Sequence, residues 1–236
     1  MDILTETTSA QFFGTEAPAK PKLKHKAKKQ PANPYPFPAP AVTEERFLRD
    51  VSGHTMTIKQ DNGLYRHLHF ANQGSFNQWF EITTWPGRLC IAGDMGTFVF
   101  RRLEDMFQFF RCQPTNKETL PINPGYWAQK CDSRDRDGVE KYSAEHFRAQ
   151  VWEWMKEGEW TGEAIQAAIE EVMPVADEGE YAAISQALSF EFCGHNFQDF
   201  YEVEVKVYTA YYLWCCYAIV WAIQQYDKAK AQEATP

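Results

Sequence analysis

The chain has 236 residues, of which 44% are hydrophobic and 15% aromatic, enough for the core of one large domain or two small ones. Its net charge of −8 is unevenly spread, because residues 1–42 carry +3 and the remaining 194 residues carry −11. Each phosphate contact needs Lys or Arg, so an acidic body disfavours general nucleic-acid binding. What remains is a basic protein partner, a surface that imitates nucleic acid, or charge that only keeps the chain soluble.

The six cysteines contain no CxxC pair, which excludes zinc-knuckle and thioredoxin-type motifs. No apolar leader stands at the N-terminus, so we expect a cytoplasmic protein with reduced thiols. An uncharged segment at 207–223 is at the short edge of a membrane span. Because it is rich in Tyr and Cys, it favours the central helix of a globular core over a membrane helix.

Residues 1–42 are predicted to form a disordered arm. The run KPKLKHKAKK at 20–29 is basic, and PANPYPFPAPA at 31–41 has proline at nearly every second position. Proline removes backbone donors and fixes an extended conformation, so a polyproline-like segment is expected. The arm is either a solvated linker, a nucleic-acid-binding tail through residues 20–29, or a proline-rich ligand for a partner.

The next segment alternates polar and apolar residues between turn residues. Asp61-Asn62-Gly63, Trp85-Pro86-Gly87 and Gly93-Asp94-Met95-Gly96 are predicted turns. The pattern predicts about five strands in an antiparallel meander, at 54–59, 64–70, 76–84, 88–92 and 97–100. Apolar residues then recur at helical spacing, which predicts a helix over 101–111 that covers one face of the sheet.

The rest of the chain reads as helical. A short helix is expected around 125–130, and capping residues Ser143 and Thr161 each open a further helix. The remaining helices are expected at 178–192 and 197–227, the last as the hydrophobic spine. Strands followed by helices indicate an α+β fold. We therefore predict one domain at 43–236, with a sheet part at 54–111 and a helical part at 143–227.

Three side chains are candidates for catalysis. His67 and His69 are two residues apart on one strand, so both project from one face, and Asp94 in its glycine-flanked loop could join them around a divalent metal. The alternative is two sheet-packed histidines and a turn in which Asp94 bonds backbone amides. A metal site needs three or four convergent ligands, so we expect no metal and no cofactor. No complete catalytic set is recognisable, which argues against an enzyme.

Arginines concentrate in the sheet block and are candidate binding residues. Arg101 and Arg102 would begin the predicted helix, where the helix dipole disfavours positive charge. Acidic side chains of the same chain would satisfy them, or a bound phosphate or acidic partner would. The candidate binding set is Arg66, Arg88, Arg101 and Arg102.

The segments WPGRLCIAGDMGTFVF and LWCCYAI carry a family resemblance. Together with YRHLHF they make residues 61–227 similar to a family of bacteriophage and prophage proteins to which no activity is assigned. In related sequences Arg is common at the position of His69, which weakens the metal hypothesis. The resemblance implies a cytoplasmic protein of the infected host cell.

Three functional hypotheses follow. The first is a phage or prophage accessory protein that binds and modulates a host protein, such as a defence or nucleic-acid-handling factor. The second is a metal-dependent enzyme of nucleic-acid or nucleotide metabolism that uses His67, His69 and Asp94. The third is a DNA-binding protein that uses the basic arm. No membrane partner is expected, and the oligomeric state stays open.

Overall fold

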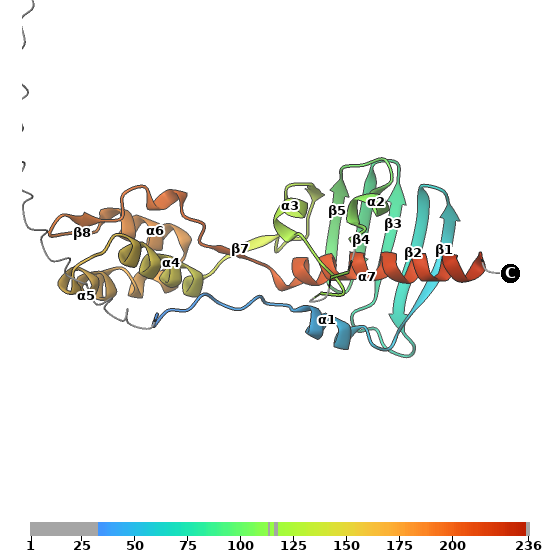
Figure 1. Cartoon of the computed structure of the whole chain (residues 1–236), viewed down its shortest axis with the longest axis horizontal. Coiled ribbons are helices and arrows are strands. Elements are labelled where there is room, and N and C mark those ends of the chain that lie inside the picture. The colour runs from blue at the N-terminus through green and yellow to red at the C-terminus, as the bar shows by residue number, and fades with distance from the viewer. Residues whose placement is uncertain (1–32, 113, 116–117, 235–236) are drawn as a thin grey trace, which may run out of the picture. The chain divides into compact units, whose positions relative to one another are not determined.

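The computed structural model describes residues 33–112, 114–115 and 118–234. It confirms the α+β class, because an antiparallel sheet is followed by a mostly helical half that ends in a long helix (Figure 1). The predicted basic run at 20–29 lies outside the described residues.

The sheet is a six-stranded meander in the order β1-β2-β3-β4-β5-β6, with every neighbouring pair antiparallel. Its strands are β1 (His54–Asn62), β2 (Tyr65–Asn72), β3 (Phe80–Trp85), β4 (Arg88–Gly93), β5 (Gly96–Arg101) and β6 (Cys131–Ser133). The first five lie where the sequence predicts strands, but the predicted third strand was wrong at its start. β3 begins at Phe80 and not at residue 76, because Gln78 has a positive φ of 58° and interrupts the extended backbone. The sixth was not predicted, and pairs through only two residue positions with β5.

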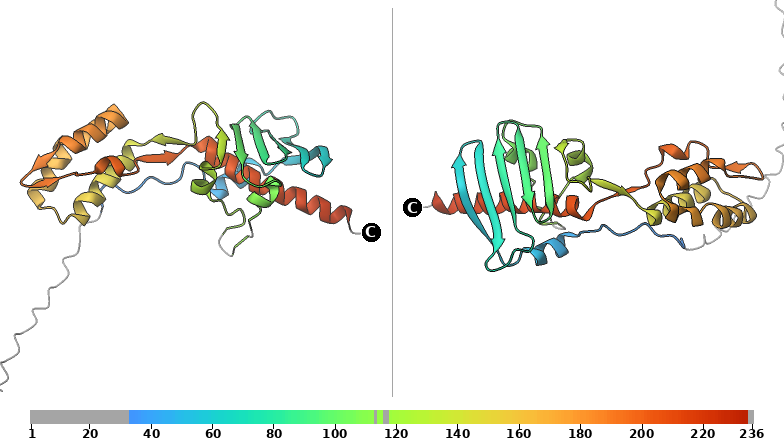
Figure 2. Two further views of the ribbon diagram at one scale, coloured as in Figure 1. Left: turned by 90° about the horizontal axis from the view of Figure 1, so that it is seen from above. Right: turned by 180° about the vertical axis from the view of Figure 1, so that it is seen from behind.

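One face of the sheet is buried. In each of the four strands β2 to β5, alternate residues such as Phe70, Ile82, Ile91 and Phe98 are fully buried. Helix α7 (Ala210–Glu233) crosses this face, and eleven of its residues are buried. Figures 1 and 2 show the helix on one side of the strands, and no helix of the coloured part of the chain lies across the other side.

Three short helices complete this core. They are α1 (Glu44–Asp50), α2 (Met106–Phe110) and α3 (Pro124–Ala128). Phe47 of α1 packs against Trp214 of α7 with ring centroids 5.1 Å apart. Trp214 also donates a hydrogen bond to Asp50, so α1 is fixed to α7 by both apolar and polar contacts.

The predicted helix over 101–111 was wrong at its start. Arg101 ends β5, and α2 begins only after Asp105, whose side chain accepts a hydrogen bond from the Phe107 amide. Arg101 and Arg102 therefore do not lie in the first turn of a helix, and no helix dipole disfavours their charge there. Buried and exposed residues still alternate at Phe98 and Phe100, as in a strand, and α2 begins only after its N-cap residue Asp105.

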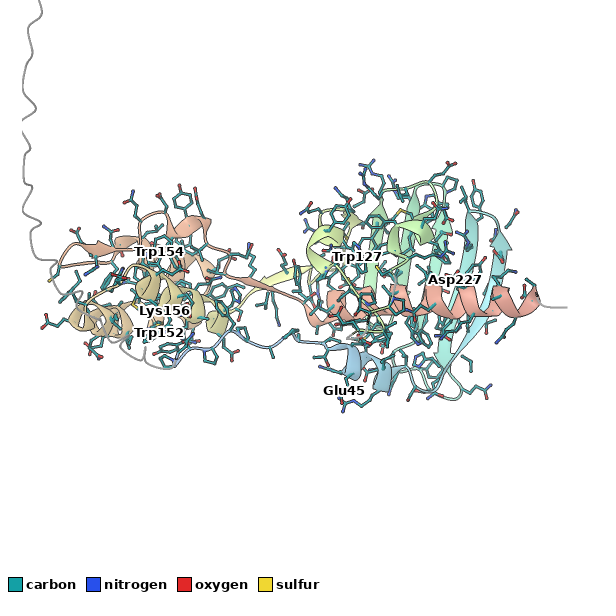
Figure 3. All side chains as sticks on the ribbon, in the orientation of Figure 1. Glu45, Trp127, Trp152, Trp154, Lys156 and Asp227 are labelled. Carbon is teal, nitrogen blue, oxygen red and sulfur yellow. The ribbon has the colours of Figure 1, made fainter. Side chains whose placement is uncertain are left out.

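A second core lies within residues 142–205. It is formed by α4 (Ala144–Glu157), α5 (Gly162–Glu171), α6 (Glu180–Ser189), the 3₁₀ segments η1 (Pro174–Glu178) and η2 (Phe200–Glu202), and the hairpin β8 (Glu191–Phe192) and β9 (His195–Asn196). Ser143 and Thr161 cap α4 and α5 as the sequence predicts. Aromatic side chains fill the centre, including Trp154 of α4 (Figure 3), which packs edge-on against Phe200.

The predicted helix at 197–227 was wrong in its first third. Residues 200–202 form η2, and β10 (Lys206–Tyr208) pairs with β7 (Glu140–Tyr142). Helix α7 starts only at Ala210, after its N-cap Thr209. The apolar residues between 197 and 227 follow helical spacing, but they belong to two different cores. Phe197 lies in the second core and Tyr212 in the first, so one continuous helix does not connect them.

Residues 33–42 were assigned to the arm, but the described structure places them in contact with the helical part. Tyr35 packs against Trp152 with ring centroids 6.1 Å apart, and Asn33 donates a hydrogen bond to Glu153. Val42 is buried. None of the helices in the described part of the chain combines the length and apolar character needed to cross a bilayer.

Candidate binding surfaces

The structure does not gather the predicted metal ligands. His67 and His69 do project from the open face of β2, but the His67 Nε2 atom lies 2.7 Å from the Glu81 carboxylate, and the His69 ring stacks on Trp79. Asp94 accepts a hydrogen bond from the Gln78 amide at 2.8 Å. Within the described ranges, no three His, Cys, Asp or Glu side chains are placed to hold a metal ion.

The Gly-Asp-Met-Gly loop is the hairpin turn between β4 and β5. Gly93 pairs with both Phe80 and Gly96, and a Cβ atom at Gly93 would lie 2.3 Å from the Trp79 carbonyl oxygen. Only glycine permits this close approach of two backbones. Asp94 in turn holds Gln78, which has a positive φ of 58°. These contacts give the loop a structural role in joining β3 to the hairpin.

Arg66 is separated from the other candidate arginines. Its side chain points to the buried face of the sheet and forms two hydrogen bonds with the Asp105 carboxylate, at 2.9 and 3.2 Å. The guanidinium lies 4.5 Å from the centroid of the Phe107 ring. Burial lowers the pKa of Arg66, but the hydrogen bonds and charges of Asp105 and Tyr226 together outweigh it and leave this pKa raised. Arg66 therefore stays charged and connects β2 to α2.

Arg88 and Arg101 lie together on the open face. They occupy directly paired positions of β4 and β5, and both contact the carboxylate of Asp132, at 3.1 and 3.4 Å. Next to them is a hollow of about 350 Å³ lined by Arg101, Arg102, Gln129, Lys130 and Asp132. Three cationic side chains against one carboxylate make this hollow a candidate site for an anion.

Two exposed aromatic side chains lie on the same face as these arginines. Trp85 pairs directly with Arg88, so their side chains lie on the same face. Arg66 pairs with Thr84, so the residues next to them, Tyr65 and Trp85, both project from the opposite, open face. Tyr65 is 51% and Trp85 38% exposed, although most aromatic side chains of the sheet are buried. Tyr65, Trp85, Arg88 and Arg101, here called the aromatic–arginine row, therefore follow one another across four strands.

The acidic charge is concentrated in the second core. Residues 143–205 contain fourteen Asp and Glu against only Arg148 and Lys156, which gives −12. Both cations are already paired, with Asp177 and Glu153. Many of the carboxylates are exposed, including those of Glu157, Glu159, Glu163, Glu170, Glu171 and Glu178.

Exposed apolar side chains accompany this charge. Tyr181 is 89%, Leu188 43% and Tyr201 61% exposed. Tyr181 and Leu188 are seven residues apart on α6, so they lie on one side of that helix. Sequence reasoning missed these three residues, because each fits a helical apolar pattern and would be expected in the core. We call Tyr181, Leu188, Tyr201 and the exposed carboxylates of residues 143–205 the acidic–tyrosine surface.

No family model, curated protein or solved structure shows significant similarity to the chain.

Proposed function

We propose that this protein is a non-enzymatic accessory protein of a bacteriophage or prophage that binds a host protein with a basic surface. The observation that carries the proposal is the charge of −12 confined to residues 143–205. A partner that normally handles nucleic acid has a surface of complementary sign, and such complementarity speeds association and selects the partner. The phage origin rests on the sequence resemblance alone.

The exposed apolar side chains favour a surface that binds a protein partner over an acidic surface that only keeps the protein soluble. Tyrosine is enriched at the energetic centres of protein interfaces, where its ring buries a large area at low entropic cost. Tyr181 and Leu188 would supply the apolar anchors, and the exposed carboxylates of residues 143–205 would supply the negative charge that faces the partner. An acidic surface that only kept the protein soluble would not be expected to expose tyrosine rings.

The arrangement gives the metal-enzyme hypothesis no support, because His67, His69 and Asp94 engage three different partners. DNA binding through the arm stays a prediction, since residues 20–29 lie outside the described part of the chain.

The test is affinity capture from host lysate with the full chain as bait, at physiological salt and after nuclease treatment. We expect a protein with a basic surface to be retained and its retention to fall at least tenfold with Tyr181→Ala, because truncation of a hot-spot residue costs ~2 kcal/mol or more. Replacing Glu170 and Glu171 by Gln should weaken retention and reduce its dependence on salt. Glu45→Gln on α1 is the matched control and should leave retention unchanged.

Two outcomes contradict the proposal. One is the absence of any specifically retained host protein under these conditions. The other is a retained protein that binds the Tyr181→Ala and Glu-to-Gln variants as well as it binds the wild type.

A further inference from the structure

We propose that the aromatic–arginine row binds single-stranded nucleic acid. This surface is separate in sequence from the acidic–tyrosine surface, so the inference goes beyond the proposed function and can fail independently of it. The row lies on the open face of the sheet, which is the face that points away from the buried core residues and toward solvent.

The register of the sheet produces the row. Trp85 pairs with Arg88, and Arg88 pairs with Arg101. Directly opposite residues in a sheet place their side chains on the same face. Neighbouring strands are roughly 4.8 Å apart, so the three intervals from β2 to β5 span roughly 14 Å. At roughly 3.4 Å per nucleotide along one strand, this is the length of about four stacked nucleotides.

The aromatic members offer ring faces to unpaired bases. Trp85 and Tyr65 are each exposed, and neither ring has an aromatic neighbour or a cation stacked on it among the described residues. Bases stack on such rings with little regard to sequence, since every base has a π-face. Bases of a duplex already stack on each other and cannot lie on a sheet in this way, which favours a single strand.

The cationic members offer charge to the phosphates. Asp132 holds the guanidinium groups of Arg88 and Arg101 on the open face, and so fixes their position before a ligand arrives. Arg102 and Lys130 add two positive charges at the adjacent hollow. The hollow of about 350 Å³ lies where the backbone of a strand would leave the row, and it can receive a phosphate.

The overall acidity of the chain does not oppose this binding locally. Residues 54–133 carry eight Lys and Arg against seven Asp and Glu, whereas the −12 lies in residues 143–205. Electrostatic repulsion of nucleic acid is therefore expected from the helical part and not from the sheet. An acidic protein segment would pair with the arginines equally well, but its carboxylates would not stack on the rings of Trp85 and Tyr65.

The experiment measures fluorescence anisotropy of a labelled oligothymidylate of about 12 nucleotides, within the site sizes of known single-strand binders, titrated with the full chain. We expect Trp85→Ala to weaken binding roughly tenfold, because loss of one stacked base has an effect of this order. Arg101→Gln should weaken binding and flatten its dependence on the logarithm of salt concentration by about 0.7. Tyr181→Ala and Arg49→Gln are the matched controls and should bind as the wild type does.

Three results would overturn the inference. The first is binding that Trp85→Ala and Arg101→Gln leave unchanged, because the basic run at 20–29 would then account for it. The second is a duplex of equal length that binds as tightly as the single strand. The third is competition by polyglutamate as effective as that by unlabelled oligothymidylate, which would make the row a site for acidic protein segments. Circular dichroism of each variant confirms that a loss of binding is not a loss of fold.

Discussion

Arg66 and Asp105 form a bidentate ion pair between β2 and the start of α2, and their side chains are only 10% and 16% exposed. Asp105 is at the same time the N-cap of α2 and accepts a hydrogen bond from the Phe107 amide. One carboxylate thus neutralises a buried cation and begins a helix.

Replacing Asp105 by Asn should strongly destabilise the protein. Asn still caps a helix well, so the substitution isolates the loss of charge. It leaves the Arg66 guanidinium buried without a counter-charge, which we expect to cost about 3 kcal/mol or more. Urea unfolding followed by tryptophan fluorescence at neutral pH measures the difference.

Asp227→Asn is the matched control for this substitution. Asp227 also forms two hydrogen bonds with an arginine, Arg111, both at 2.8 Å, but the side chains are 39% and 41% exposed. An exposed pair contributes less than about 1 kcal/mol. Equal losses of stability in the two variants would contradict the view that burial of Arg66 makes its pair important.

Thr209 should contribute to stability as the cap of α7. Its hydroxyl accepts from the Tyr212 amide at 3.3 Å and donates to the Gly138 carbonyl at 3.0 Å. Thr209→Ala removes both hydrogen bonds and should lower the free energy of unfolding by about 1 kcal/mol or more. Thr209→Ser keeps the hydroxyl and should recover most of this loss, as chemical denaturation can determine.

Alkaline pH should destabilise the helical part through Tyr142. Burial raises the pKa of Tyr142 to about 12 from its usual 10, and its hydroxyl donates to the Ala176 carbonyl at 2.9 Å. Between these two pH values the folded state holds a proton that the unfolded state has released, so stability falls as pH rises. Below pH 10 the contribution is fully present.

Unfolding curves taken at several pH values from below 10 to about 12 test this expectation. Tyr142→Phe loses the hydrogen bond and should be less stable than the wild type at neutral pH. The same variant should lose less stability than the wild type over the alkaline range, because it has no proton to release there. If the free energy of unfolding falls with pH as steeply in Tyr142→Phe as in the wild type, other tyrosines are responsible for the fall.

The cysteines should differ sharply in reactivity. Cys193 is exposed, whereas Cys215 and Cys216 are buried in α7, and burial raises the pKa of each of these two thiols. The thiolate is the reactive form, so a thiol reagent such as DTNB should modify Cys193 rapidly in the native protein and reach Cys215 and Cys216 only on unfolding. Cys193→Ser should remove the fastest phase. Rapid labelling of Cys216 in the native state would contradict the described packing.

The fold class and five strands could be predicted because their signals are local. Alternation at Leu68 and Phe70 and the turn at Pro86-Gly87 each depend on a few neighbouring residues. Pairing of β10 with β7 joins residues more than sixty positions apart and leaves no local pattern, so the sequence wrongly predicts a helix over Lys206 to Tyr208. β6 was missed for the same reason, because the three residues Cys131 to Ser133 have no local strand pattern and form a strand only by pairing with β5.

The candidate surfaces were predictable only in part. Arg88 and Arg101 were identified from composition, but their juxtaposition with Trp85 depends on the register of three strands. A two-residue turn at Pro86-Gly87 already places Trp85 opposite Arg88, so that half of the row was accessible from the sequence. Exposure of Tyr181 was not, because it depends on which side of α6 the second core covers.

The position of α7 also bears on how the protein is made. The buried face of the sheet and α1 both pack against residues 212–226, which the ribosome produces more than a hundred residues after β5. During translation the strands can pair, but their apolar face stays exposed until α7 has left the exit tunnel. Nascent chains halted before residue 210 should therefore recruit chaperones, and chains extended far enough for α7 to pack on the sheet should release them.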